Sequence, residues 1–201
     1  MPAPTSESAR RRHQDILAAA TDLFGRKGWP VTTTDEVAAQ AGVTKRTLYK
    51  YFGSKQALLY EVGKSITDIS RARAQTLATL EGSPGDRMRT VIVSYIDLVS
   101  AWQVRYAVFL EEMKHLDDAQ LAHVREIGTE WVALVRGIIE DGQRSGDFDR
   151  GHDATVAAFT ILELLNGMTY WVRGDGAWSQ AQLADHTTRL VFAGLAVDQA
   201  A

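Results

Sequence analysis

Residues 32–59, TTTDEVAAQAGVTKRTLYKYFGSKQALL, contain the signals of three short helices in one compact stretch. Thr33 and Glu36 have the spacing of a capping box, in which the two side chains satisfy free N–H groups where a helix begins. Gly42 can end this helix because it adopts a left-handed backbone at low cost, and Thr44 is suited to cap the next helix. Two helices joined by so tight a turn are typical of a helix-turn-helix, whose second helix enters the major groove of DNA.

This second helix would present basic and hydroxyl side chains to DNA. Lysine and arginine pair with guanine acceptors, whereas hydroxyl groups and helix amino-termini suit phosphates. Ser54 would cap the following helix, whose first turn adds the positive charge of Lys55. Leu48 and Phe52 are assigned to the core. The predicted DNA-contacting residues are Thr33, Thr44, Lys45, Arg46, Thr47, Tyr49, Lys50, Tyr51 and Lys55.

The charge of the chain is distributed unevenly. Residues 1–64 carry ten Lys and Arg against six Asp and Glu, whereas the remainder carries twelve against nineteen, for a net charge of -3. A basic amino-terminal module on an acidic remainder fits a DNA-binding head on a body that phosphates would repel. The chain has no cysteine, which excludes disulfides, thiolate catalysis and cysteine zinc sites.

The amino-terminal sequence MPAPTSESARRRHQ has no apolar run, so we expect neither a signal peptide nor a membrane anchor. No other stretch approaches the ~20 apolar residues that a membrane span requires. We therefore expect a cytoplasmic protein.

Helical periodicity continues along the chain, and no strand-like alternation interrupts it. We predict an all-α protein of about nine helices. Residues 1–9 would be a disordered tail, 10–54 a three-helix DNA-binding head, and 55–201 a larger bundle for ligand binding and dimerisation. Arg10, Arg11 and Arg12 could add an arm that contacts the minor groove or the DNA backbone, or could be a merely solvated tail. Two separate helices are expected near 87–102 and 106–116, although no Gly or Pro lies between them.

Apolar residues occupy more than one face of the segment 153–173. A helix that is apolar most of the way round has to be buried on more than one side. In a chain of this size, a second subunit is the simplest cover. Together with a final helix from about Ser179, this segment would form a dimer interface. The residues predicted to lie there are Phe159, Leu162, Leu190, Val191 and Leu195.

Aromatic and methionine side chains recur at helical spacing between residues 87 and 173. This pattern is typical of plain core, but effector pockets between bundle helices have the same apolar composition. The residues predicted to line such a pocket are Tyr95, Trp102, Tyr106, Phe109, Met113, Trp131, Val135, Met168 and Trp171.

Metal and catalytic chemistry have little support in the sequence. Glu112 and His115 have the spacing of a ligand pair on one helical face, but no complete ligand set accompanies them. No nucleophile motif lies near a histidine. We predict no metal, no cofactor and no catalytic residue.

The sequence AQAGVTKRTLYKYFGSKQALL, preceded by GWPVTTTDEVA, resembles the DNA-binding head of the TetR family of transcriptional regulators. The resemblance covers roughly residues 10–60, and the remainder matches only in length and helical layout. It implies a homodimer, joined through the last two helices, that binds double-stranded palindromic operator DNA. Such proteins are mostly repressors that a small molecule releases from the operator. Arg46 departs from the pattern, because many members carry a small residue there.

The distal sequence IIEDGQRSGDF followed by YWVRGDG is similar to members that control fatty-acid or steroid breakdown and respond to acyl-CoA thioesters. We therefore expect either a small hydrophobic effector or an acyl-CoA. Two other classes stay open. One is a helical ligand-binding or scaffolding protein whose head contacts protein and not DNA; the other, with no positive evidence, is an enzyme acting on a thioester.

Overall fold

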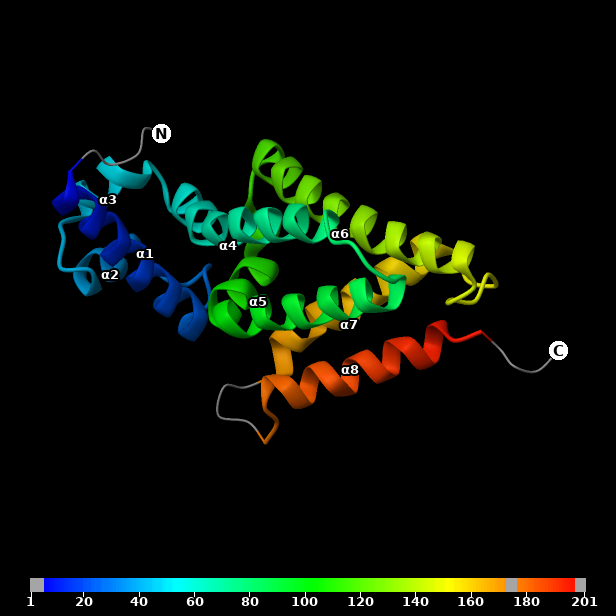
Figure 1. Cartoon of the computed structure of the whole chain (residues 1–201). Coiled ribbons are helices and arrows are strands. Elements are labelled where there is room, and N and C mark those ends of the chain that lie inside the picture. The colour runs from blue at the N-terminus through cyan, green and yellow to red at the C-terminus, as the bar shows by residue number, and fades with distance from the viewer. Residues whose placement is uncertain (1–5, 173–176, 198–201) are drawn as a thin grey trace. The chain divides into compact units, whose positions relative to one another are not determined.

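The computed structural model describes residues 6–172 and 177–197, and every regular element in this part of the chain is helical (Figure 1). The all-α prediction is confirmed. None of the helices in these residues is long and apolar enough to cross a membrane. The helices are α1 (Glu7–Lys27), α2 (Thr34–Gln40), α3 (Lys45–Phe52), α4 (Lys55–Ala78), α5 (Pro84–Glu112), the 3-10 turn Met113–His115, α6 (Asp118–Ser145), α7 (Ala154–Trp171) and α8 (Gln180–Leu195).

A serine, threonine or aspartate immediately precedes each of the eight α-helices. Its side-chain oxygen accepts a hydrogen bond from a backbone N–H in the first turn, which satisfies one of the donors that a helix leaves free. The residue immediately before each helix therefore decides where that helix begins. The capping residues are Ser6, Thr33, Thr44, Ser54, Ser83, Asp117, Asp153 and Ser179.

The prediction of a disordered tail over residues 1–9 is wrong for its last three residues. Helix α1 begins at Glu7 because the side chain of Ser6 caps it, accepting from the N–H of Ala9 at 3.2 Å. Residues 1–5 lie outside the described part of the chain. Arg10, Arg11 and Arg12 lie within α1, and their contact with DNA stays a prediction.

Helix α5 contains the two helices that were predicted near 87–102 and 106–116. They are joined in one element that ends at Glu112, and they meet at a kink where Trp102 has non-helical backbone angles (φ -123°, ψ 18°). Counted with α5 as one element, the described residues form eight α-helices and a 3-10 turn, in agreement with the predicted count of about nine helices.

The chain divides into two compact units. The head unit runs to Thr67 and includes Val104–Ala122, and the body unit contains Asp68–Gln103 and the chain from His123 onward. The predicted boundary between residues 54 and 55 lies at the start of α4, whereas the head unit extends beyond it. Leu48 and Phe52 are buried in the head unit, as expected from their assignment to the core.

Candidate nucleic-acid interface

The turn between α2 and α3 has the geometry of a helix-turn-helix. Gly42 has a φ of 65°, and the N–H of Val43 donates to the carbonyl of Ala38 at 2.9 Å. Thr44 caps α3 by accepting from the N–H of Thr47 at 3.1 Å. Leu48 faces the core of the head unit, which leaves the polar side of α3 at the surface. The turn therefore leaves one side of α3 exposed, as in the recognition helix of a helix-turn-helix.

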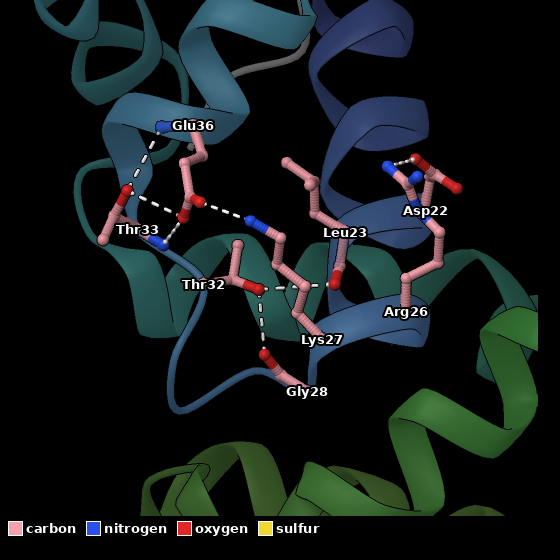
Figure 2. Close-up of polar contacts among 8 residues, drawn as sticks. All are labelled: Asp22, Leu23, Arg26, Lys27, Gly28, Thr32, Thr33 and Glu36. Atoms are coloured by element: carbon pink, nitrogen blue, oxygen red, sulfur yellow. Dashed lines mark hydrogen bonds and ion pairs between the residues drawn. The ribbon is translucent and has the colours of Figure 1, made fainter.

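A network of polar contacts holds α2 against α1 (Figure 2). The predicted capping box is present: Thr33 N–H donates to Glu36 Oε2 at 2.8 Å, and Glu36 N–H donates to Thr33 Oγ1 at 3.2 Å. Lys27 of α1 donates to the other oxygen of the Glu36 carboxylate at 2.5 Å. The buried hydroxyl of Thr32 donates to the Gly28 carbonyl at 2.8 Å. These contacts set the position of the helix that precedes α3.

The Glu36 network should make the head unit sensitive to acid. The hydrogen bond from Lys27, followed by those from the backbone and side chain of Thr33, lowers the pKa of Glu36 from 4.5 to about 2. A carboxylate with a lowered pKa stabilises the fold above its ordinary pKa, and this contribution is lost as the pH falls towards the lowered value. We expect Glu36→Gln, which keeps the capping box, to be less stable than wild type at pH 7, with a difference that shrinks as the pH falls below 4.5 and is only partly lost at pH 3.

Urea unfolding of both proteins between pH 7 and pH 3 measures this difference. Glu7→Gln is the control, because Glu7 is an exposed carboxylate in the first turn of α1. A difference for Glu36→Gln that does not change with pH would show that the ionised carboxylate is not what stabilises the contact.

Two pairs of side chains connect α2 to the exposed side of α3. Lys45 Nζ lies 2.8 Å from Asp35 Oδ2, and the hydrogen bond from this carboxylate, then its charge, raises the pKa of Lys45. The hydroxyls of Thr34 and Tyr49 are 3.2 Å apart. Sequence reasoning selected Lys45 and Tyr49 but missed Asp35 and Thr34, because no periodicity relates residues on two different helices.

Arg46 and Lys50 lie on the same exposed side of α3. Neither side chain makes a hydrogen bond or an ion pair with any other residue in the described part of the chain. By contrast, the hydroxyl of Thr44 is engaged with Thr47, 2.9 Å away, and Tyr51 is half-buried with its ring against that of His13. Arg46 and Lys50 are therefore the cations of α3 that are available to a ligand.

Lys55 has a more restricted environment than the sequence suggested. Its ammonium donates to the Pro30 carbonyl at 3.2 Å and lies 4.3 Å from the centroid of the Trp29 ring. Burial lowers the pKa of Lys55, and the charge of Glu112 opposes this effect. The N–H of Trp29 donates to Glu112 at 3.2 Å, and its ring stacks on His115. Lys55 thus holds the loop between α1 and α2 in place.

The residues predicted to line a pocket lie in both units. Tyr106, Phe109 and Met113 belong to the head unit, where Phe109 is fully buried. The others belong to the body unit, where Trp102 and Trp171 are partly exposed and Tyr95, Trp131, Val135 and Met168 are buried.

Tyr95 and Trp131 form a polar cluster inside the body unit. Their rings meet edge to face at 4.8 Å. The hydroxyl of Tyr95 donates to Asn166 Oδ1 at 2.5 Å, and the indole N–H of Trp131 donates to Ser70 Oγ at 2.8 Å. These hydrogen bonds satisfy the polar atoms of two side chains that are buried in the apolar interior of the unit.

The predicted dimer residues fall into two groups. Phe159 on α7 and Leu190 on α8 are 53% and 54% exposed, which suits a surface that a partner covers. Leu162 is buried in the core of its own chain, so its place in a subunit contact is not supported. Val191 and Leu195 are also buried, but they line a groove of about 520 Å³ between α7 and α8.

The Glu112–His115 pair does not extend to a metal site. His115 Nε2 lies 3.4 Å from Glu112 Oε2, but nowhere in residues 6–172 and 177–197 do three or more His, Asp or Glu side chains gather around a common point. The pair belongs instead to the contacts around Trp29.

Comparisons with known proteins cover both units. The profile of a family described as "Bacterial regulatory proteins, tetR family" matches residues 16–62, and one described as "Tetracyclin repressor-like, C-terminal domain" matches residues 81–195. The transcriptional repressor KstR2 of Rhodococcus jostii is 23% identical, over 97% of this chain and 96% of the relative. The fatty acid metabolism regulator protein of Bacillus subtilis is 22% identical, over 92% of this chain and 96% of the relative.

Among solved structures, the chain is similar to AibR, which was crystallised with isovaleryl coenzyme A and operator DNA. The sequences are 25% identical and the TM-score is 0.79, with 90% of this chain and 98% of that chain covered.

Proposed function

Because this chain belongs to the TetR family of bacterial transcriptional regulators, which are not enzymes, we propose that it is a cytoplasmic repressor that binds operator DNA as a homodimer and is released by a small-molecule effector. The observation that carries the DNA-binding role is the exposed side of α3. There, Arg46 and Lys50 have no partner in the described residues, while Thr44 and Leu48 hold the helix on its unit.

We assign the proposed DNA contacts according to this geometry. Arg46 and Lys50 would read base edges, since arginine and lysine pair with guanine O6 and N7. Tyr49 and Lys45 would contact DNA only by leaving, or sharing, their bonds to Thr34 and Asp35. The other predicted residues already make contacts within the head unit. Their proposed role is to position α3 and to bring backbone N–H groups to phosphate. These residues are Thr33, Thr44, Thr47, Tyr51 and Lys55.

The proposed homodimer rests on the apolar surface of α7 and α8. Val156, Phe159 and Leu190 are each more than half exposed. Exposed apolar surface of this kind marks an interaction site, and burying it against a second copy would remove it from water. The groove between α7 and α8 has Val156 and Leu190 in its wall, so a partner that covers this face would also cover the groove.

An acyl-CoA or another small hydrophobic molecule is the proposed effector. The body unit offers the Tyr95–Trp131 cluster, and the buried hydroxyl of Thr169 has no hydrogen-bond partner among the described residues. A bound polar group could satisfy this hydroxyl, because leaving it unpaired costs about 1–3 kcal/mol. Similarity to AibR, crystallised with an acyl-CoA, supports the thioester.

Binding to genomic fragments tests the proposal. Sites enriched by the purified protein from a fragment library should contain a pseudo-palindrome, with half-sites about one helical turn, ~34 Å, apart. Sedimentation of the complex should give two or another even number of chains per site. Affinity should fall steeply with salt, because phosphate contacts release counterions. No sequence-dependent binding at any salt concentration would favour a scaffolding protein instead.

The same complex tests the effector. Isovaleryl-CoA and a longer acyl-CoA should each be added to the preformed complex, with free coenzyme A as the control for the shared nucleotide. Release by an acyl-CoA alone would support a thioester effector. If neither acyl-CoA releases the DNA, these two thioesters are excluded as effectors, and the DNA-binding proposal is unaffected.

A further inference from the structure

Asp35 places a negative charge on the surface that the proposed function assigns to DNA. It lies in the first turn of α2, and its carboxylate is 2.8 Å from the ammonium of Lys45 at the start of α3. Asp35 is 65% exposed and Lys45 is 51% exposed, so DNA can reach both side chains. An exposed ion pair contributes only ~0–1 kcal/mol, so phosphate can compete for the lysine at a modest cost.

This ion pair affects the two modes of DNA binding differently. Binding to non-operator DNA depends almost entirely on phosphate contacts, each of which makes the salt dependence steeper by ~0.9. A lysine held by a carboxylate contributes less to these contacts, and the carboxylate itself is repelled by phosphate. Binding to an operator adds base contacts from Arg46 and Lys50, which have no acidic partner among the described residues.

We propose that Asp35 is a specificity-determining residue, which keeps Lys45 from phosphates on non-operator DNA and so raises the ratio of operator to non-operator affinity. This role rests on the proposed function. In the operator complex, the ammonium of Lys45 can leave Asp35 for a guanine edge, where O6 and N7 accept it. On other sequences a phosphate has to displace the carboxylate to reach the lysine, which weakens that contact.

The test compares Asp35→Asn with wild type on an enriched operator and on random duplex DNA over a range of salt. The variant should bind random DNA roughly five-fold more tightly at low salt, with a salt slope steeper by ~0.9, and gain less on the operator. Asp22→Asn is the matched control. It removes the same charge from the head unit, but its carboxylate contacts Arg26 and Gln40, which lie outside α3.

A second comparison, in the Lys45→Ala background, isolates the pair. The gain from Asp35→Asn should fall there to the small gain that Asp22→Asn gives, because no lysine is left to release and only the loss of one negative charge remains. Equal gains from Asp35→Asn and Asp22→Asn in the wild-type background, an unchanged salt slope, or a gain of undiminished size with Lys45→Ala would each overturn the proposal. If wild type shows no sequence-dependent binding, the proposed function itself fails and Asp35 has no such role. Thermal unfolding of each variant confirms that the head unit is folded.

Discussion

Replacing Gly63 with alanine should destabilise the protein by about 1–3 kcal/mol or more, through overpacking of the head unit. Gly63 is buried in α4, and a Cβ atom placed there would lie 1.9 Å from Cδ2 of the Phe109 ring. Phe109 is itself 1% exposed, so the ring has little room to move away. The change would force either the ring or α4 to shift. Urea or thermal unfolding of the full chain measures the loss.

Gly128→Ala is the matched control, since Gly128 is also a helical glycine. A Cβ atom at this position in α6 meets no other atom within 4 Å. Alanine is the better helix former, so we expect this variant to be more stable than wild type by roughly 0.5–1 kcal/mol. If both variants were more stable than wild type, helix propensity and not contact with Phe109 would decide the outcome at Gly63.

Replacing Arg46 and Lys50 together with alanine should reduce operator affinity by about 30-fold or more. Each base contact of this type contributes ~1–3 kcal/mol of discrimination, so losing both should also bring the affinities for operator and random DNA closer together. Both side chains are exposed, so the free energy of unfolding should change by no more than ~0.5 kcal/mol. Fluorescence anisotropy with labelled operator and random duplexes measures both affinities.

The control for this variant is the pair Lys114→Ala and Arg125→Ala. It removes the same two positive charges from exposed positions outside the helix-turn-helix. It should lower both affinities slightly and equally, through the change in net charge alone. An equal loss of operator affinity in the two double variants would contradict direct reading by α3.

Local sequence predicted most of the helix-turn-helix correctly. The capping contacts of Thr33, Glu36 and Thr44 and the turn at Gly42 join residues no more than four positions apart, so they depend on the backbone of the same turn. The same holds for the assignment of Leu48 to the core, because a helix with one apolar side has to bury that side. Where a signal was overlooked, as with Ser6 before α1, it was also local.

The candidate sites depended on contacts between distant residues, and there the sequence was a poorer guide. Phe159 and Leu162 lie three positions apart on α7 and are both apolar, but one is exposed and the other buried. Lys55 and Lys50 are similar in sequence terms, yet the first lies against Pro30 and Trp29 while the second has no partner in the described residues. Composition cannot make these distinctions.

The amino-acid sequence by itself determined that this protein is all-helical, where its helices begin, and that it carries a helix-turn-helix. These properties follow from interactions within a few residues along the chain, so they can be predicted without knowing the tertiary structure. Only the tertiary structure decided which cations of α3 are free to bind, that Asp35 holds Lys45, and that Phe109 packs on Gly63. Those outcomes depend on which helix faces which, and packing between distant segments sets that arrangement.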